Sequence, residues 1–402
     1  MKILFLSSWF PYPPDNGARN RTYNLLNALS ARHEVFLISQ VQKDSDPCTA
    51  ALPDSWSLVS LHPAKQFDGR MAKSIIGLLS SRPRSFVDTH DPELGRAVRA
   101  TISTLAPDVV VASTLDIAAY VPSDVAIPTV LDEHNCEYAV LMRHAKRVSS
   151  TLRRIRATVG WKKFARWEAR LCRRFDSVVT VSDCDKRHLL EVAPDLRPIT
   201  VIPNGVDTDH FTPMDHAPDP NMLVYNGALT YGANLDAVRY FASDIHPLLA
   251  NSLPQAKLLV TGRTAGVDMR GIADCPGIEM TGYVDDIRDV LRKSAACIVP
   301  LREGGGSRLK ILEAMAAGVP VVSTSMGAEG IDAEHGTHLL VADDPSEFAE
   351  AIVSVLADDT LAESLIRNAR ELVEARYSWS AIGERFVQVV EAAARARCPA
   401  LA

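Results

Sequence analysis

The feature that most constrains the fold is a repeated alternation between short, wholly apolar runs and longer amphipathic stretches. Runs such as Ile3–Leu6 and Val109–Ala112 contain no polar residue. Strands that helices cover on both faces have this composition, whereas a strand with one wet face alternates apolar and polar residues. The stretches between the runs, such as Arg19–Arg32, place apolar residues at helical spacing. The sequence therefore predicts an α/β protein with doubly wound parallel sheets.

The alternation falls into two series, which predicts two Rossmann-like domains facing each other across a cleft. A chain of 402 residues is also too long for one hydrophobic core. Between the series, Pro203–Asn221 has four Pro in 19 residues and reads as a linker. We expect a first domain over 1–205, a second over 206–379 and a final helix over 380–402 that crosses back to the first. The expected strands are Ile3–Leu6, Val35–Ile38, Leu58–Leu61, Val109–Ala112, Thr129–Leu131, Val178–Val181 and Thr200–Ile202, then Met222–Tyr225, Lys257–Thr261, Ile278–Tyr283, Cys297–Leu301, Val319–Ser323 and His338–Ala342.

Composition excludes several classes of protein. A net charge of −6 argues against nucleic acid as a partner. The seven Cys are scattered without a C-x-x-C pair, which favours reduced thiols in the cytoplasm over a disulfide framework. Met1–Phe10 is interpreted as a buried first strand, because its apolar core is too short for a signal peptide. No apolar run approaches the roughly 20 residues of a membrane-spanning helix.

The most informative segment for chemistry is a strand that runs into a glycine-rich turn and then a helix. Gly304, Gly305 and Gly306 let the backbone approach a ligand closely, and Ser307 is expected to cap the helix. Arg308 and Lys310 add two cations where the helix start already favours an anion, and Glu313 could accept hydrogen bonds from a ribose diol. The group predicts a nucleotide diphosphate site. The alternative is a surface loop with solvated charges.

Other motifs are weaker. Gly17 lies in the segment Asp15–Arg19 that precedes the first helix, where it would let backbone amides face a ligand or be an ordinary loop glycine. His134 lies at the carboxyl end of a predicted strand, where a side chain can reach a ligand. The chain has neither a Walker phosphate loop nor a G-x-G-x-x-G turn, which disfavours NAD. The acidic pairs Asp183–Asp185 and Asp207–Asp209 are interpreted as a helix cap and linker residues, so neither a metal nor another cofactor is expected.

Taken together, these motifs resemble family 4 retaining glycosyltransferases with the GT-B fold. The resemblance covers nearly the whole chain, and the order and spacing of the pieces make it specific. They are Lys2–Leu6, the Gly17 loop, His33–Val35, Asp132–Asn135, Phe175–Ser182, Val201–Asp207, Gly227–Leu229 and Leu312–Val321. The resemblance implies transfer of a hexose from a nucleotide diphosphate sugar to a glycan or lipid-linked acceptor. It also implies retention of configuration, with the acceptor bound by the first domain and the donor by the second.

The resemblance also implies roles for individual residues. Glu313 would bind the donor ribose, Arg308 and Lys310 the diphosphate, and His134 would lie near the transferred sugar. The loop that contains Gly17 would close over the phosphates of the donor. Tyr283 and Val284 would read the nucleobase through their backbone, and the donor-binding glycines are Gly227, Gly262 and Gly304–Gly306, followed by Ser307.

Two positions depart from the family pattern. Gly305 stands where the family often has a glutamate, and Glu303 lies two residues away from that position. The Arg and Lys that usually follow the first strand of the second domain are missing from Gly227–Asn234. We hypothesise that Arg308 and Lys310 substitute for those two cations.

One segment, 143–174, concentrates positive charge. It holds twelve Lys and Arg and a single acidic residue, Glu168, and its apolar residues recur at three or four positions. That pattern is typical of a helix at an anionic membrane surface, which would place the protein at the inner face of a membrane. The alternative is an ordinary domain helix with an apolar face in the core and solvated charge.

Two alternatives to glycosyl transfer are a sugar-nucleotide epimerase or phosphorylase on a similar frame, and a non-catalytic nucleotide-sugar sensor. A transferase releases free nucleotide diphosphate, which separates it from the epimerase or phosphorylase. It also turns over its donor, whereas a sensor only binds it.

Overall fold

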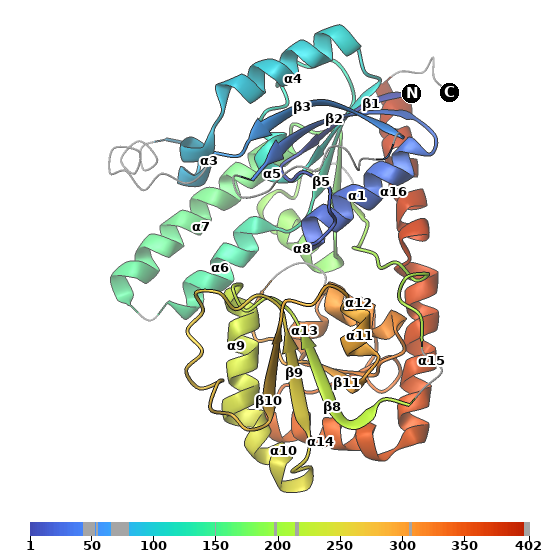
Figure 1. The fold of residues 1–402 in the computed structure, drawn as a ribbon. Coiled ribbons are helices and arrows are strands. Elements are labelled where there is room, and N and C mark those ends of the chain that lie inside the picture. Colours follow the sequence, from blue (N-terminus) through green and yellow to red (C-terminus); the bar gives the residue numbers. More distant parts are fainter. Residues whose placement is uncertain are drawn as a thin grey trace. The chain divides into compact units, whose positions relative to one another are not determined.

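The computed structural model describes residues 1–42, 53, 55–65, 80–148, 150–196, 199–213, 217–304 and 308–397. The chain divides into two compact units, one made of Met1–Pro203 with Ile382–Ala402 and the other of Asn204–Ala381. Each unit contains its own parallel sheet covered by helices (Figure 1). The structure thus confirms the predicted class, two doubly wound α/β sheets.

The sheet of the first unit has seven parallel strands in the order β3-β2-β1-β4-β5-β6-β7. The switch in strand order lies between β1 and β4. β1 pairs with β2 on one side, as in Ile3↔Val35, and with β4 on the other, as in Ile3↔Val109. Each predicted apolar run of the first series lies in or overlaps one strand. The strands are β1 (Lys2–Ser7), β2 (Glu34–Val41), β3 (Trp56–Pro63), β4 (Val109–Ser113), β5 (Thr129–Glu133), β6 (Ser177–Thr180) and β7 (Ile199–Val201).

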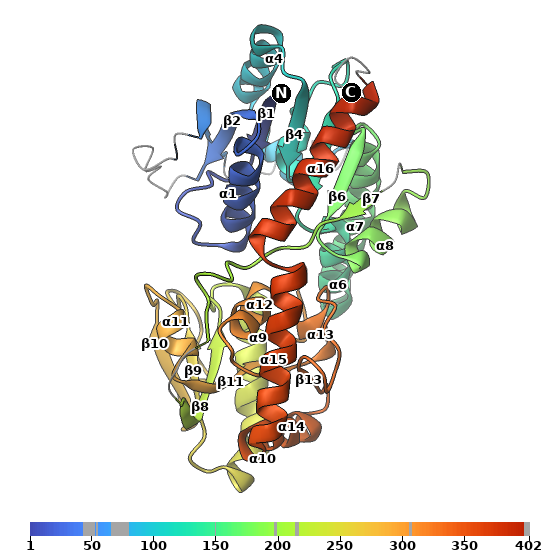
Figure 2. The ribbon, with the colours of Figure 1, turned by 90° about the vertical axis from the view of Figure 1, so that its right-hand side faces the viewer.

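Both faces of this sheet are buried, which explains why its strands show no alternation. Leu4 and Leu6 belong to the apolar core beneath α4, α5 and α7, while Ile3 and Phe5 are equally buried on the opposite face. On that opposite face α1 and α16 lie side by side, close enough that a Cβ on Gly383 would meet Ala28 (Figure 2). The helices are α1 (Gly17–Ser30), α3 (Arg84–Thr89), α4 (Pro92–Leu105), α5 (Leu115–Ala118), α6 (Glu137–Arg147), α7 (Thr151–Cys172), α8 (Asp183–Val192) and α16 (Trp379–Arg397).

The sheet of the second unit has six parallel strands in the order β10-β9-β8-β11-β12-β13, so its switch point lies between β8 and β11. Leu258, Leu259 and Val260 are buried in succession, which again requires cover on both faces. Expected and observed strands agree to within a few residues at their ends. The strands are β8 (Asp219–Asn226), β9 (Lys257–Thr261), β10 (Ile278–Gly282), β11 (Ser294–Val299), β12 (Val321–Ser323) and β13 (Leu340–Val341).

In the second unit the pattern predicts helices at Asn234–Leu249, Ser307–Ala317, Pro345–Leu356 and Thr360–Arg376, and the structure has helices in all four places. The short helices α11 and α13 were not predicted. Where the pattern predicts a single helix over Asn234–Leu249, the structure has α9, a π-helical turn at Phe241–Ile245 and α10. Pro247 has no N–H to offer the carbonyl of Ser243, and the His246 amide bonds the Phe241 carbonyl instead. The helices are α9 (Gly232–Tyr240), α10 (His246–Ser252), α11 (Arg288–Leu291), α12 (Leu309–Ala316), α13 (Ser325–Ala328), α14 (Pro345–Ala357) and α15 (Asp359–Arg376).

The final helix, α16, packs on the first unit from Ile382 onward. Arg32 in the turn after α1 forms an ion pair with Glu384, with 2.6 Å between Nη2 and Oε2, and His33 Nε2 lies 3.1 Å from Glu391 Oε1. None of the described helices combines the length and the apolar composition that a membrane span requires.

Candidate functional site

Most of the predicted donor-binding residues meet at the carboxyl edge of the second sheet, next to its switch point. Asn226 ends β8, and β11 leads into Gly304 and then α12. Open α/β sheets bind ligands in this place, because the connections from neighbouring strands diverge there and leave an opening.

Lys310 on α12 reaches back to the end of β8. Its Nζ lies 3.0 Å from Asn234 Oδ1 and 4.0 Å from the centre of the Tyr225 ring. The Tyr225 hydroxyl donates to the same Asn234 oxygen at 2.8 Å, and the Asn234 amide nitrogen donates to the Ala228 carbonyl. A Cβ on Gly227 would lie 2.8 Å from Lys310 Nζ. The ammonium therefore occupies the position just after β8, where the sequence lacks its own cation.

Arg308 supplies a second cation beside the first. It is 7% exposed, and its guanidinium packs over Gly304, whose φ is +121°. A Cβ at Gly304 would lie 3.1 Å from Arg308 Nη2, so both the backbone angle and the space favour glycine there. Burial lowers the pKa of Lys310 to about 7, and the charge of Arg308 acts in the same direction. Two close cations, the buried Arg308 and the partly buried Lys310, favour a polyanionic ligand.

Glu313 lies one turn further along α12 and is held by Asn226. The Asn226 amide donates to Glu313 Oε2 at 2.9 Å, while Asn226 Oδ1 accepts from the Thr261 hydroxyl. The other carboxylate oxygen has no hydrogen-bond partner in the described part of the chain. Burial raises the pKa of Glu313, whereas Lys310 and Asn226 counteract that rise. The carboxylate is thus fixed in place with an oxygen available to a hydroxyl donor.

The predicted nucleobase residues lie at the neighbouring strand ends. A Cβ on Gly262 would come within 2.7 Å of the Ala228 amide nitrogen, and the Gly262 amide donates to the Gly282 carbonyl at 2.8 Å. Gly227 and Gly262 therefore allow the ends of β8, β9 and β10 to approach closely. Tyr283 follows β10, is exposed, and lies under the Arg263 guanidinium at 5.7 Å from its ring centre. Val284 follows it with partial burial.

The structure corrects the start of the helix after the glycine-rich turn. The sequence predicts Ser307 as N-cap with Arg308 in the first turn, but α12 begins at Leu309 and Arg308 is the N-cap, with a non-helical ψ of 87°. Its side chain makes no capping hydrogen bond. Gly305, Gly306 and Ser307 lie outside the described residues.

In the first unit, His134 follows β5 and belongs to a buried polar chain. Its Nε2 lies 2.9 Å from Ser113 Oγ and 3.1 Å from Asp132 Oδ2. Arg21 holds Asp132 through Nε and Nη2, both within 3.1 Å. Burial alone would raise the pKa of Asp132, but Arg21 and His134 bring it well below its usual value. A carboxylate can only accept, so Nε2 of His134 is the donor in its hydrogen bond to Asp132.

Gly17 is the first residue of α1 rather than part of the loop before it. The Asn16 side chain caps this helix by accepting from the Arg19 amide at 3.1 Å.

The two acidic pairs named in the sequence make local hydrogen bonds. Asp185 accepts from the Cys136 amide, and Asp207 accepts from the amides of Asp209 and His210. No group of three or more potential metal-binding side chains occurs among the described residues.

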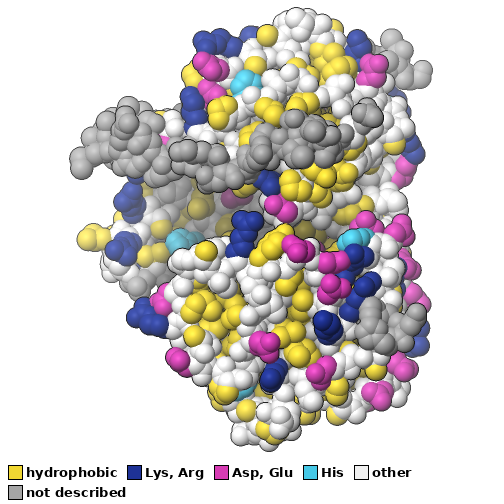
Figure 3. Space-filling model, viewed as in Figure 1, with side chains coloured by type: hydrophobic (Ala, Val, Ile, Leu, Met, Phe, Trp, Pro, Cys, Tyr) yellow, Lys and Arg dark blue, Asp and Glu magenta, His cyan; other side chains and the backbone are white. Residues whose placement is uncertain are grey.

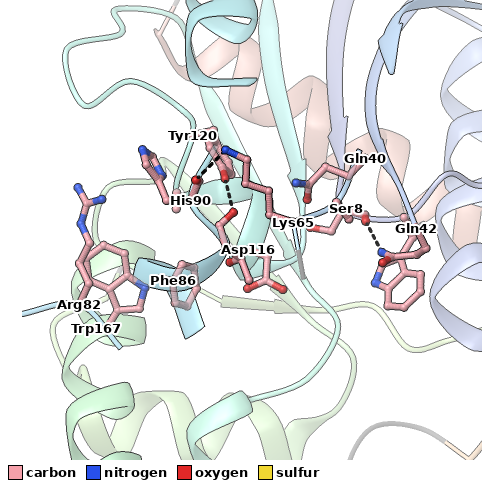
Figure 4. Close-up of a pocket in the computed structure, with 14 residues that line it drawn as sticks. Ser8, Gln40, Gln42, Lys65, Arg82, Phe86, His90, Asp116, Tyr120 and Trp167 are labelled. Carbon is pink, nitrogen blue, oxygen red and sulfur yellow. Dashed lines mark hydrogen bonds between the residues drawn. The ribbon is translucent and has the colours of Figure 1, made fainter. Parts of the chain in front are cut away.

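A cavity at the carboxyl edge of the first sheet was not predicted from the sequence. It measures about 240 Å³, and its walls include Ser8, Gln40, Lys65, His90 and Asp116 (Figure 4). These residues come from five separate segments, which the strand order brings together. The signal that could have found Ser8 and Asp116 is their position just after β1 and β4, the two strands at the switch point.

Comparison with known proteins gives concordant matches. A model described as "Glycosyltransferase Family 4" matches residues 15–210, and one described as "Glycosyl transferases group 1" matches residues 220–358. Glycogen synthase from Mycobacterium tuberculosis (strain ATCC 25618 / H37Rv) is 27% identical over 437 aligned residues, covering 98% of this chain and 95% of that protein.

Solved structures share the fold along the whole chain. Sucrose-phosphate synthase from Thermosynechococcus elongatus has a TM-score of 0.74 at 18% identity, covering 98% of this chain and 99% of the other. Anabaena HepE, in complex with UDP and glucose, has a TM-score of 0.68 at 16% identity, covering 98% and 100%.

Proposed function

Because this chain belongs to the family 4 retaining glycosyltransferases, which use nucleotide diphosphate sugars, we propose that its donor is a uridine diphosphate hexose and that Arg308 and Lys310 bind the diphosphate. The observation that carries this proposal is the pair of cations, Arg308 buried and Lys310 partly buried, at the switch point of the second sheet, one turn from Glu313. HepE, which has the same fold, is solved with UDP and glucose. Glu313 then binds the ribose, with Tyr283 and Val284 beside the base.

The chemistry follows from the charge that bond cleavage creates. When the bond between the sugar and the diphosphate breaks, negative charge grows on the departing phosphate oxygens. Arg308 and Lys310 stabilise that charge from fixed positions, and comparable groups in oxyanion sites contribute about 2.7–4 kcal/mol each. The acceptor hydroxyl attacks the anomeric carbon on the face that the diphosphate leaves, and its proton passes to the leaving phosphate. Two protein cations take the place that a divalent ion has in metal-dependent transferases. A contact between His134 and the transferred sugar stays a prediction from the family resemblance.

Product analysis tests this function. The protein is incubated with UDP-glucose, UDP-galactose, UDP-N-acetylglucosamine and GDP-mannose and a panel of glycan and lipid-linked acceptors, with EDTA in a parallel series. We expect release of UDP and an axial anomeric bond in the product by NMR, at the same rate in EDTA. Release from GDP-mannose alone, or a loss of activity in EDTA that Mg²⁺ or Mn²⁺ restores, would contradict the proposal.

We also propose that the start of α7 contacts an anionic membrane surface. The apolar face predicted for this segment divides into two parts. Trp167 and Leu171 are buried in the core, whereas Leu152, Ile155 and Val159 are 81%, 58% and 54% exposed. Spacings of three and four residues put these three on one side of the helix, between exposed Arg153, Arg154 and Arg156. At the left edge of Figure 3, yellow side chains lie among dark blue ones in this region.

Flotation with vesicles tests the membrane contact. We expect recovery with phosphatidylglycerol vesicles, much less recovery with phosphatidylcholine vesicles, and a loss of flotation in a triple Leu152→Ser, Ile155→Ser, Val159→Ser variant. Leu248→Ser, at an exposed leucine on α10, is the matched control and should float like the wild type. Equal recovery with both lipids would refute the contact.

A further inference from the structure

We propose that the cavity at the carboxyl edge of the first sheet holds one sugar unit of the acceptor, so that the acceptor is a glycan or glycoside whose terminal sugar is recognised by Asp116, Gln40 and Trp167. This inference rests on the proposed transfer function. It adds the chemical class of the acceptor and the residues that select it, which neither the fold nor the family specifies.

The cavity has the position of a ligand site. Ser8 follows β1 and Asp116 lies on α5, directly after β4, so the two flank the switch point of the sheet. Between them Thr114 has a φ of +86°, which is strained for a β-branched residue, and its hydroxyl lies 2.7 Å from Ser8 Oγ. Strained backbone of this kind gathers at functional sites, because the rest of the fold must maintain it.

Three polar groups in the cavity wall lack partners in the described part of the chain. The Asp116 carboxylate makes no hydrogen bond or ion pair there. The Gln40 side chain is 8% exposed, and its amide makes none either. The Trp167 side chain is also 8% exposed, and its Nε1–H is buried without an acceptor. Buried polar groups are nearly always satisfied, so the Gln40 amide and the Trp167 Nε1–H point to a ligand or to ordered water. Asp116 is exposed at the rim of the same cavity, where its carboxylate can accept from a bound ligand.

The kinds of partner that these groups require identify the ligand. The carboxylate of Asp116 needs donors, the indole of Trp167 needs an acceptor, and the amide of Gln40 needs one of each. An anion offers acceptors alone, and a cation offers donors alone. A hydroxyl group offers both, and several hydroxyls on one rigid frame would satisfy all three side chains. Figure 4 shows Gln40 and Trp167 at opposite ends of the cavity, with Asp116 between them.

The remaining walls fit the ring of a sugar. Phe86 packs on Trp167 with ring centres 5.4 Å apart, and His90 is stacked on Tyr120 at 5.3 Å. Trp9 also lines the cavity. Rigid aromatic walls with a few placed polar groups are typical of small-ligand sites, and a pyranose presents C–H groups to such walls. A volume of about 240 Å³ equals roughly eight waters, which suits one sugar unit rather than an oligosaccharide.

The charges in the wall disfavour a phosphate. Lys65 Nζ is paired with Asp91 Oδ1 at 3.1 Å. Burial, together with Arg82 and Lys65, lowers the pKa of His90, which therefore stays neutral at neutral pH. The Arg82 guanidinium lies over the Trp167 ring, 5.5 Å from its centre. An anion in the cavity would face the unpaired carboxylate of Asp116.

Saturation-transfer NMR on the full chain tests the proposal. The probes are the methyl glycosides of glucose, galactose, mannose and N-acetylglucosamine, together with glycerol 1-phosphate as the anionic competitor. We expect at least one glycoside to bind the wild type, and its dissociation constant to rise about tenfold or more in Asp116→Asn and in Gln40→Ala. Asp124→Asn, which changes an exposed carboxylate paired with Arg99, is the matched control and should bind like the wild type.

UDP binding is measured on every sample, which separates this proposal from the proposed function. Loss of glycoside binding with UDP binding intact shows that the variants are folded and supports the sugar pocket. The pocket is refuted if no glycoside binds, if binding survives both substitutions, or if glycerol 1-phosphate binds instead and is lost on Lys65→Ala or Arg82→Ala. A wild type that binds a glycoside but no UDP refutes the donor site alone.

Discussion

At the scale of single residues, the proposed donor site depends on the environment of the Lys310 ammonium. The ammonium is half-buried beside Arg308 and is held by a hydroxyl-bonded amide, Asn234, and by the ring of Tyr225. Such a cation is disfavoured in the free protein, which is why its pKa falls to about 7. A diphosphate would remove that penalty, because each cation then faces an opposite charge. The binding of donor and the protonation of Lys310 should therefore be linked.

This linkage predicts a pH dependence of UDP binding. The protonated lysine binds the diphosphate, so the dissociation constant should rise about tenfold or more between about pH 7 and pH 9. Lys310→Arg keeps its charge throughout and should flatten the profile, whereas Lys257→Arg, on an exposed strand end, should not. Calorimetric titration with UDP at several pH values measures the dissociation constant for the wild type and for each variant. Parallel profiles for the wild type and Lys310→Arg would exclude the link.

The tight packing around Lys310 predicts that one methyl group added at Gly227 weakens UDP binding. A Cβ on Gly227 would lie 2.7 Å from Asn234 Nδ2 and 2.8 Å from Lys310 Nζ, so Gly227→Ala should displace the lysine and weaken UDP binding about tenfold. Gly232→Ala is the matched control, because a Cβ there meets nothing within 4 Å. Equal dissociation constants for the two variants would show that the packing around Lys310 does not matter for binding.

At the scale of elements, buried carboxylates join α6 to α7. Glu168 on α7 accepts from the amides of Glu137 and Tyr138 at 2.8 Å each, and so caps the start of α6. Glu133, at the end of β5, lies against it. Burial, and then the charge of Glu168, raises the pKa of Glu133 well above its usual value. The folded protein therefore favours the protonated form of Glu133, while Glu168 serves as the cap.

The raised pKa predicts how stability changes with pH. Above about pH 4.3 the unfolded chain releases the Glu133 proton and the folded chain keeps it, so the free energy of unfolding falls as pH rises. Glu133→Gln removes this dependence, and its gain in melting temperature over the wild type should be larger at pH 8 than at pH 5. Glu93→Gln, at an exposed position of α4, serves as the control. A difference that does not change with pH would disprove the buried proton.

The elements also show what could be predicted from sequence. Val109–Ala112 and Leu258–Val260 read as strands because burial on both faces leaves them uniformly apolar. The break in the helix after Asn234 was missed, although Pro247 carries the signal. Arg308, Lys310 and Glu313 stand out because they are charged at a helix start. Asn226 and the cavity residue Gln40 do not, since their roles depend on which strand ends become neighbours, and strand order is a property of the whole sheet.

At the scale of the whole molecule, each sheet places its candidate site at its own switch point. In the second unit two cations and a fixed carboxylate form the proposed donor site. In the first unit the Asp116 carboxylate, the Gln40 amide and aromatic rings form the proposed acceptor pocket. The difference in chemistry matches the difference in ligand, a charged diphosphate in one and a sugar in the other. We therefore expect the second unit to bind its donor mainly through the charge of the diphosphate.

The most direct test compares UDP with uridine in thermal unfolding, on the wild type, Arg308→Ala and Arg302→Ala. Arg302 is the control because it is already paired with Asp236 at 2.7 Å. We predict that UDP at about 100 times its dissociation constant stabilises the wild type and Arg302→Ala by about 2.7 kcal/mol, that uridine does much less, and that Arg308→Ala loses the UDP effect. Equal stabilisation by uridine and UDP, or an undiminished UDP effect in Arg308→Ala, would contradict the account.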